Sequence, residues 1–257
     1  MSNSSADHSE TAAAQPLPVQ AGVCASSRRS VCHAALLGIV GLAAAWLSWA
    51  AMEQIGEVFQ LSPEIARLGV GQIPGAEDQK KIVAGKLVLF YKHAALWLGT
   101  TGVFLGGLSG LALGRIRQSR TAIILATVGG IVLGGAFSAA AGALAVYSGQ
   151  LFLANLANGP LTIPEHQVML MHALTWLVVG LGVGLGTGLG TTWQHASGSM
   201  LISGIAGALG GALYPFVASV AMPLVDASFP VPEGDASRLL WLGLPCAIIG
   251  LAIGRRG

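Results

Sequence analysis

Two histidines and one carboxylate are the residues of this sequence best suited to chemistry. His93 and His172 each precede a tryptophan by four residues and lie near the start of long apolar stretches, and Glu165 precedes His172 by seven residues. Imidazole and carboxylate groups at one depth of a membrane can hold a divalent metal ion or relay protons. His93, His172 and Glu165 are therefore the candidate polar residues of a site.

A structural role for these histidines is the alternative, and the sequence favours it. Amphipathic rings gather at the headgroup level of a membrane, and Tyr91, Trp97, Trp176 and Trp241 lie near the ends of apolar stretches in the same way. The sequence has no HExxH motif, no paired cysteine spacing and no Gly-x-Ser-x-Gly motif. We accordingly predict no catalytic residue, no metal site and no cofactor.

Six charge-free stretches must position these residues. Only 9% of the 257 residues are charged and 53% are hydrophobic, whereas about 25% of an average soluble domain is charged. This composition excludes an ordinary soluble enzyme and a nucleic-acid binder. A helix needs about 20 apolar residues to cross a bilayer, and the stretches are too long for barrel strands. We predict an all-α integral membrane protein, a bundle of six transmembrane helices over residues 31–52, 93–114, 121–148, 169–191, 199–225 and 239–254.

The distribution of charge predicts the orientation. Polar residues 1–30 are expected to form a disordered tail, with residues 31–257 as the transmembrane domain. Arginines cluster before the first stretch, between the second and third, and after the sixth: Arg28, Arg29, Arg115, Arg117, Arg120, Arg255 and Arg256. The positive-inside rule then predicts a multi-pass protein of the inner membrane with both termini in the cytoplasm.

The first external loop, residues 53–92, is the exception to this charge pattern. It contains Lys80, Lys81, Lys86 and Lys92. Its first part, residues 53–81, has an apolar pattern interrupted by a proline, which predicts short amphipathic helices on the membrane surface. A docking site for another subunit is the second interpretation of this loop.

Glycines recur at every fourth position of several stretches, which places them on one face of a helix. Small residues with this spacing let helix backbones approach closely in lipid. The sequence thus predicts glycine-zipper packing through Gly102, Gly106, Gly110, Gly114, Gly130, Gly134, Gly182, Gly186, Gly207 and Gly211. In the fourth stretch, glycine alternates with larger residues over residues 180–190. This alternation gives two glycine stripes and predicts either a central packing helix or a bent, partly unwound one.

Short sequence matches indicate an internal repeat. The string His93 to Leu98 resembles His172 to Leu177, and Leu96 to Gly99 recurs as Leu240 to Gly243. The simplest explanation is three helical hairpins that run in the same direction as parallel repeats. Chance similarity between apolar, glycine-rich stretches is the alternative.

Two classes of function are compatible with this pattern. The first is a non-catalytic scaffold, assembly or sensor subunit, with the lipid bilayer and a membrane-protein partner or a second copy as its contacts. The second is a transporter or channel for ions or small solutes. A secondary transporter normally carries charged or polar groups near the bilayer midplane, and the stretches contain no Asp, Glu, Lys or Arg. The scaffold is therefore the favoured prediction.

Overall fold

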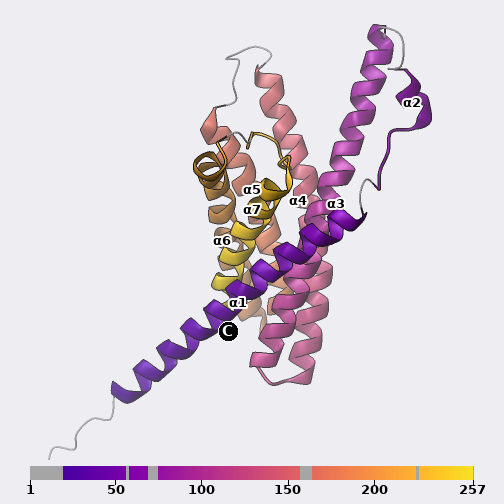
Figure 1. Cartoon of the computed structure of the whole chain (residues 1–257). Helices are drawn as coiled ribbons and strands as arrows, with labels where there is room; N and C mark the ends of the chain where they lie inside the picture. The colour runs from indigo at the N-terminus through magenta and orange to yellow at the C-terminus, as the bar shows by residue number, and fades with distance from the viewer. Residues whose placement is uncertain (1–19, 56–57, 69–74, 157–163, 224–225, 257) are drawn as a thin grey trace, which may run out of the picture.

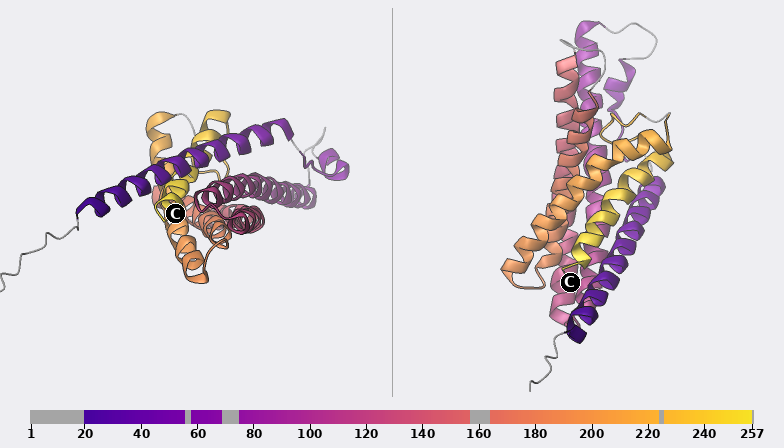
Figure 2. Two further views of the ribbon diagram at one scale, coloured as in Figure 1. Left: turned by 90° about the horizontal axis from the view of Figure 1, so that it is seen from below. Right: turned by 90° about the vertical axis from the view of Figure 1, so that its left-hand side faces the viewer.

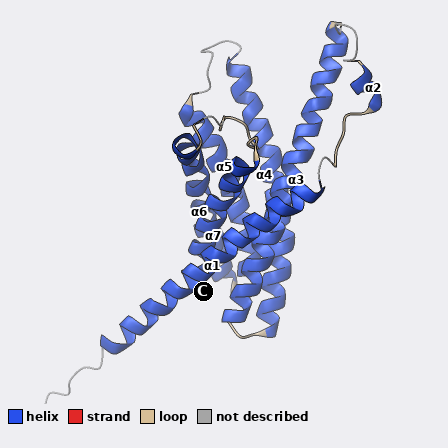
Figure 3. Cartoon of the chain, viewed as in Figure 1, coloured by secondary structure: helices blue, strands red, loops and turns tan. Residues whose placement is uncertain are grey.

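The computed structural model describes residues 20–55, 58–68, 75–156, 164–223 and 226–256. These residues form helices and no strand (Figures 1 and 3). Six helices are long and apolar enough to cross a membrane, which indicates a multi-pass membrane protein and confirms the predicted all-α class. In order, the helices are α1 (Gln20–Ile55), α2 (Pro63–Arg67), α3 (Ala76–Ile116), α4 (Arg120–Leu156), α5 (Glu165–Gly188), α6 (Trp193–Ala221) and α7 (Asp235–Gly254).

The six long helices form an inner group of three and an outer group of three. Helices α3, α5 and α7 contact one another. Each outer helix contacts two of them: α1 lies against α3 and α7, α4 against α3 and α5, and α6 against α5 and α7. Helix α1 runs beside α7 and is tilted against α3 (Figures 1 and 2). Short turns join α3 to α4 and α5 to α6 at one end of the bundle, the turn end, and the opposite end is the loop end.

The outer helices expose large apolar side chains, as helices surrounded by lipid do. Examples are Ile39 on α1, Val132 on α4 and Val220 on α6, which are 64%, 59% and 74% exposed. The inner helices instead supply most of the largest buried side chains, including Leu98 and Trp176. Because lipid tails are as apolar as these side chains, their exposure carries no penalty in a bilayer.

Several helices extend beyond the predicted stretches. Helix α1 begins at Gln20 and so includes residues 20–30 of the predicted tail, whereas residues 1–19 lie outside the described residues. Helix α3 begins at Ala76, well before the predicted start at residue 93. In the segment expected to form surface helices, α2 is a five-residue helix packed on α3, where the Ile65 side chain lies against Gly85. Figure 1 shows α2 beside the upper part of α3.

Glycines lie where helices approach most closely. On α3, a methyl group at Gly102, Gly106 or Gly110 would overlap a backbone carbonyl of α4, belonging to Gly134, Gly130 and Ala126 respectively. A methyl group at Gly114 would overlap Ile123, and Gly207 and Gly211 of α6 lie against the carbonyls of Trp176 and His172. Larger residues at these positions would force the backbones apart.

The two glycine stripes of α5 contact two different helices. Gly182 and Gly186 lie against α4, close to Phe137 and the Gly129 carbonyl. Gly180, Gly184 and Gly188 lie against α6 at Ser203, Ser199 and Ala196. Helix α5 is helical throughout from Glu165 to Gly188, so no unwound stretch interrupts it, and the last residues of the alternating segment, Leu189 and Gly190, form the turn that follows. Helices α6 and α7 likewise continue through their internal prolines, Pro215 and Pro245.

Candidate functional site

His172 lies at the centre of a buried polar cluster near the loop end. Its ring is 1% exposed, although it is only seven residues from the start of α5. His172 Nε2 lies 3.0 Å from the carbonyl oxygen of Ala227, in the connection between α6 and α7, and Nδ1 lies 3.1 Å from Nε1 of Trp241 on α7. A carbonyl only accepts and an indole N–H only donates, so this network assigns the proton to Nε2.

The assignment leaves His172 no free nitrogen. Nε2–H donates to Ala227, and the lone pair of Nδ1 accepts from Trp241. A metal ligand or a proton acceptor needs a free lone pair on one ring nitrogen. In this arrangement the imidazole therefore acts as a structural link between α5, α7 and the connection that precedes α7.

Aromatic rings enclose this link. Tyr214 of α6 meets the His172 ring edge-on at a centroid distance of 5.0 Å, and its hydroxyl lies 2.9 Å from Oγ of Ser237 on α7. Trp176 and Trp241 pack edge-to-face at 5.6 Å and are both fully buried. These tryptophans are core residues, so the predicted belt of rings facing the headgroups is wrong for them. Edge-to-face pairs stabilise a core by about 0.5–1.5 kcal/mol beyond their buried area.

The other candidate residues do not join His172. His93 is partly buried on α3, and its Nε2 lies 3.2 Å from the Phe59 carbonyl oxygen. Glu165 is exposed in the first turn of α5, where its negative charge interacts favourably with the helix dipole and stabilises the helix. Among the described residues there is no group of three or more His, Cys, Asp or Glu residues that could hold a metal ion.

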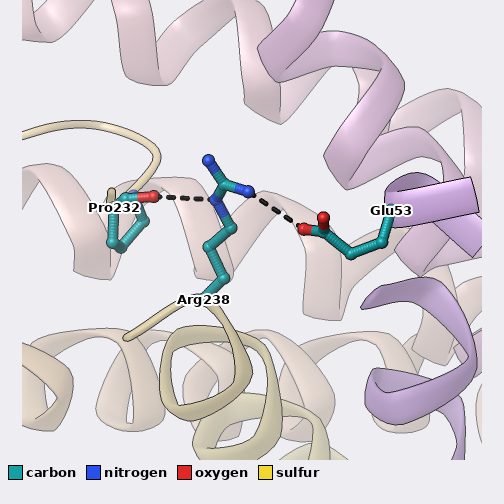
Figure 4. Close-up of polar contacts among 3 residues, drawn as sticks. All are labelled: Glu53, Pro232 and Arg238. Atoms are coloured by element: carbon teal, nitrogen blue, oxygen red, sulfur yellow. Dashed lines mark hydrogen bonds and ion pairs between the residues drawn. The ribbon is translucent and has the colours of Figure 1, made fainter. Parts of the chain in front are cut away.

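Arg238 forms a second link at the loop end (Figure 4). Its guanidinium donates to Oε1 of Glu53 at 3.0 Å and to the Pro232 carbonyl at 3.1 Å, and it lies 5.3 Å from the centre of the Trp97 ring. These contacts join α1, α3 and α7. The sequence analysis missed this pair because Glu53 and Arg238 are 185 residues apart, and only their shared position at the ends of apolar stretches could have signalled it.

Sequence analysis also missed the partners of His172. One signal was available: the alignment of Trp97 with Trp241 puts Ser237 at the position of His93 and His172. That register identifies Ser237 as a polar residue at the depth of the histidines. It does not identify Tyr214 or Ala227, because their contacts with α5 and α7 depend on how the helices pack.

A groove lies outside the bundle, between α3 and the chain around α2. Its volume is about 510 Å³, and the residues that line it include Phe59, Leu61, Ile65, Val88 and Lys92. The ammonium group of Lys92 lies 5.5 Å from the centre of the Phe59 ring, within the range of a cation–π contact. The groove is therefore apolar along most of its length and cationic at the end nearest the bundle.

Comparison with protein-family models, curated proteins and solved structures gives no match for this chain.

Proposed function

We propose that this protein is a non-catalytic subunit of a membrane complex, a scaffold or assembly component whose main role is to present surfaces to a partner. The observation that carries this proposal is the apolar contact among the three inner helices. Leu105 of α3, Val183 of α5 and Ile249 of α7 are all fully buried. They belong to one apolar core cluster that also contains Leu98, Val179 and Leu242 of the same three helices, where a transporter would need polar groups for its substrate.

Three buried threonines of the inner helices give further support. Thr187, in the glycine-rich part of α5, is fully buried and donates to the Val183 carbonyl of its own helix at 2.9 Å. Thr101 and Thr175 bond their own helices in the same way, to Trp97 and Met171. Hydroxyls that are used internally offer few contacts to a solute. His172 is also fully engaged, which weakens a proton-relay function.

The test against transport is a flux assay on purified protein in proteoliposomes. We expect the leak of protons, potassium ions and small neutral solutes to equal that of protein-free liposomes, with an added ionophore as the positive control. Flux above the protein-free level that saturates with solute concentration would overturn the scaffold proposal in favour of a transporter.

The test for assembly compares two preparations in one mild detergent. We expect the protein extracted directly from its native membrane to migrate at a larger mass than the same chain purified alone. Co-migration of the two preparations would contradict the proposal, because a scaffold subunit must have a partner in the membrane.

We further propose that the protein spans the inner membrane with both termini in the cytoplasm. The turn end carries Arg115 in the last turn of α3, Arg117 in the connection and Arg120 at the start of α4, and Arg255 and Arg256 follow α7. Burial lowers the pKa of the Arg117 guanidinium, yet arginine stays charged at neutral pH. A membrane-impermeant maleimide applied to intact cells should label Gly75→Cys at the loop end and leave Ser119→Cys at the turn end unlabelled. The opposite pattern would reverse the orientation.

Glycine-zipper packing and an internal threefold repeat complete the proposal. The predicted hairpins correspond to α1 with α3, α4 with α5, and α6 with α7. Three antiparallel pairs between successive hairpins support both features: α3 with α4, α5 with α6, and α7 with α1. In the third pair, a methyl group at Gly41 would overlap the Cys246 carbonyl, and one at Gly250 would overlap the Leu37 carbonyl. The inner helices α3, α5 and α7 would be equivalent members, each with a buried tryptophan near the loop end: Trp97, Trp176 and Trp241.

A further inference from the structure

The loop end carries a projection with no core of its own. We call residues 58–68 and 75–93 the outer arm. None of these residues is buried, and every buried residue of α3 lies between Ala94 and Gly114. Val83, Val88 and Phe90 are 59%, 52% and 60% exposed. Of these three residues, Val88 lines the groove. Large apolar side chains that stay exposed on and near a groove mark a surface suited to a partner.

The part of the outer arm that contains these apolar residues is positively charged. Lys80, Lys81, Lys86 and Lys92 are all exposed, and residues 79–92 contain no Asp or Glu. Lys80 pairs with Glu77 at 3.2 Å. Within the described residues, Lys81, Lys86 and Lys92 have no ion pair. This run of lysines is also the exception to the charge pattern that orients the protein.

We propose that the outer arm docks a protein segment that carries carboxylates beside large apolar side chains. Apolar side chains of the partner would fill the groove between Phe59, Ile65 and Val88, and its carboxylates would pair with Lys81, Lys86 and Lys92. This inference rests on the proposed scaffold function and specifies the chemistry of its partner. Complementary charge selects the partner and speeds its association, while the groove supplies the apolar contact.

The height of the outer arm disfavours a lipid as the occupant. Its part of α3, residues 76–93, contains 18 residues and extends about 27 Å at a rise of about 1.5 Å per residue. The headgroup region of one leaflet is only about 5–8 Å thick. Gly85, which lines the groove, is nine residues from Ala94 and thus about 13 Å along α3 from the bundle. With the hydrocarbon boundary placed at Ala94, the groove residues Gly85 and Val88 lie beyond the headgroups, whereas Leu89 and Lys92 lie at their level.

Symmetry disfavours a second copy of the chain as the occupant. Two copies inserted in one membrane with the same orientation have parallel outer arms. Contact between parallel arms would bring the lysine run over residues 80–92 against itself. Like charges juxtaposed in an interface cost several kcal/mol, so the complementary surface belongs to a different, acidic chain.

The test uses two synthetic helical peptides and the full chain in nanodiscs of zwitterionic lipid. One peptide has leucine on one face and glutamate beside it, and the other replaces every glutamate with lysine. We expect at least about tenfold tighter binding of the glutamate peptide, measured by fluorescence anisotropy, and a loss of that preference as salt rises from about 0.05 to 0.5 M.

Two variants of the chain make this test specific. Lys81→Glu, Lys86→Glu and Lys92→Glu together should invert the preference between the peptides. Arginine at the same three positions retains the charge and should leave the preference unchanged, which controls for damage to the outer arm.

Three results would overturn the inference. The first is equal binding of both peptides, and the second is a preference that the glutamate variant does not alter. The third is lysine-dependent recruitment of anionic vesicles, or lysine-dependent dimerisation, without binding of the glutamate peptide. Each result leaves the flux and native-mass tests of the scaffold function unaffected, so failure of this inference is distinguishable from failure of that function.

Discussion

The two halves of helix α3 are held in different ways. From Ala94 to Ile116 the helix packs its backbone against α4, with carbonyl groups opposite Gly102, Gly106 and Gly110. From Ala76 to His93 the same helix has no buried residue and is covered on one side by the short α2. The packing of residues 94–116 depends on glycines, which have no side chain, whereas residues 76–93 are held by a few side-chain contacts with α2. Position along one helix thus decides whether a substitution disrupts the fold or only changes the surface.

The largest effect is expected where backbones touch. Gly106→Ala adds a methyl group that overlaps the Gly130 carbonyl. Because the obstacle is backbone and not a movable side chain, the cost should exceed the roughly 1–3 kcal/mol that is typical of overpacking. Gly243→Ala is the matched control, because the nearest atom to the added methyl group is a Leu42 carbon at 3.8 Å. Alanine favours a helix over glycine by up to about 1 kcal/mol. We expect Gly106→Ala to lower the melting temperature in detergent and Gly243→Ala to maintain or raise it. Equal shifts would contradict the packing argument.

The second effect contrasts the two histidines. His172→Ala removes a buried ring and leaves the Trp241 N–H and the Ala227 carbonyl without their partner. Loss of this contact and creation of a cavity should together cost about 2–4 kcal/mol. His93→Ala removes one partly buried hydrogen bond to Phe59 and should cost less than about 1.5 kcal/mol. Chemical unfolding of both variants in mixed micelles measures the difference, and a larger effect for His93→Ala would reverse the comparison.

A smaller effect is expected at the junction between the bundle and the outer arm. Glu53→Gln removes the charge that pairs with Arg238, whose side chain is 29% exposed against 35% for Glu53. Partly exposed ion pairs contribute about 1 kcal/mol or less and are weakened by salt. The difference in unfolding free energy between Glu53→Gln and the wild type should therefore shrink as ionic strength rises. A salt-independent difference would indicate that Glu53 acts through packing.

The smallest effect is expected in the outer arm. Val88→Ser replaces an exposed apolar side chain that lines the groove and should change stability by no more than about 0.5 kcal/mol. The same substitution should weaken binding of the glutamate peptide. Substantial unfolding of the Val88→Ser variant would show that the outer arm has a core of its own, and the contrast between the two halves of α3 would disappear.

Hydropathy identifies a helix only where the helix is apolar. For this reason the sequence predicts the membrane-spanning parts of the fold and not the polar extension of α3. The six stretches without charge correspond to helices because lipid excludes both charge and unpaired backbone. The extension of α3 over residues 76–93 contains Glu, Asp and Lys, so none of the charge-free stretches includes it. Alanine, leucine, lysine and glutamate are nonetheless good helix formers, and the helix continues into the polar region.

The site was less predictable than the fold. His172 was identified by its residue type, but its role depends on Trp241 from a helix 69 residues further along the chain. A polar side chain near the end of an apolar stretch can face lipid headgroups, water or another helix, and only the packing of α5 against α6 and α7 decides among them. Close packing at Gly207 and Gly211 turns that end of α5 inward.

Contact between the first and last long helices has a consequence for biosynthesis. Helix α1 lies mainly against α7, and α7 begins 180 residues after α1 ends. At a synthesis rate of about 5–20 residues per second, α1 waits on the order of 10–40 s in the membrane before α7 emerges. During that interval its glycine positions Gly38 and Gly41 lack their partners on α7. Until α7 packs against α1, the exposed face of α1 can therefore bind a chaperone or a premature partner, or be cut by a protease.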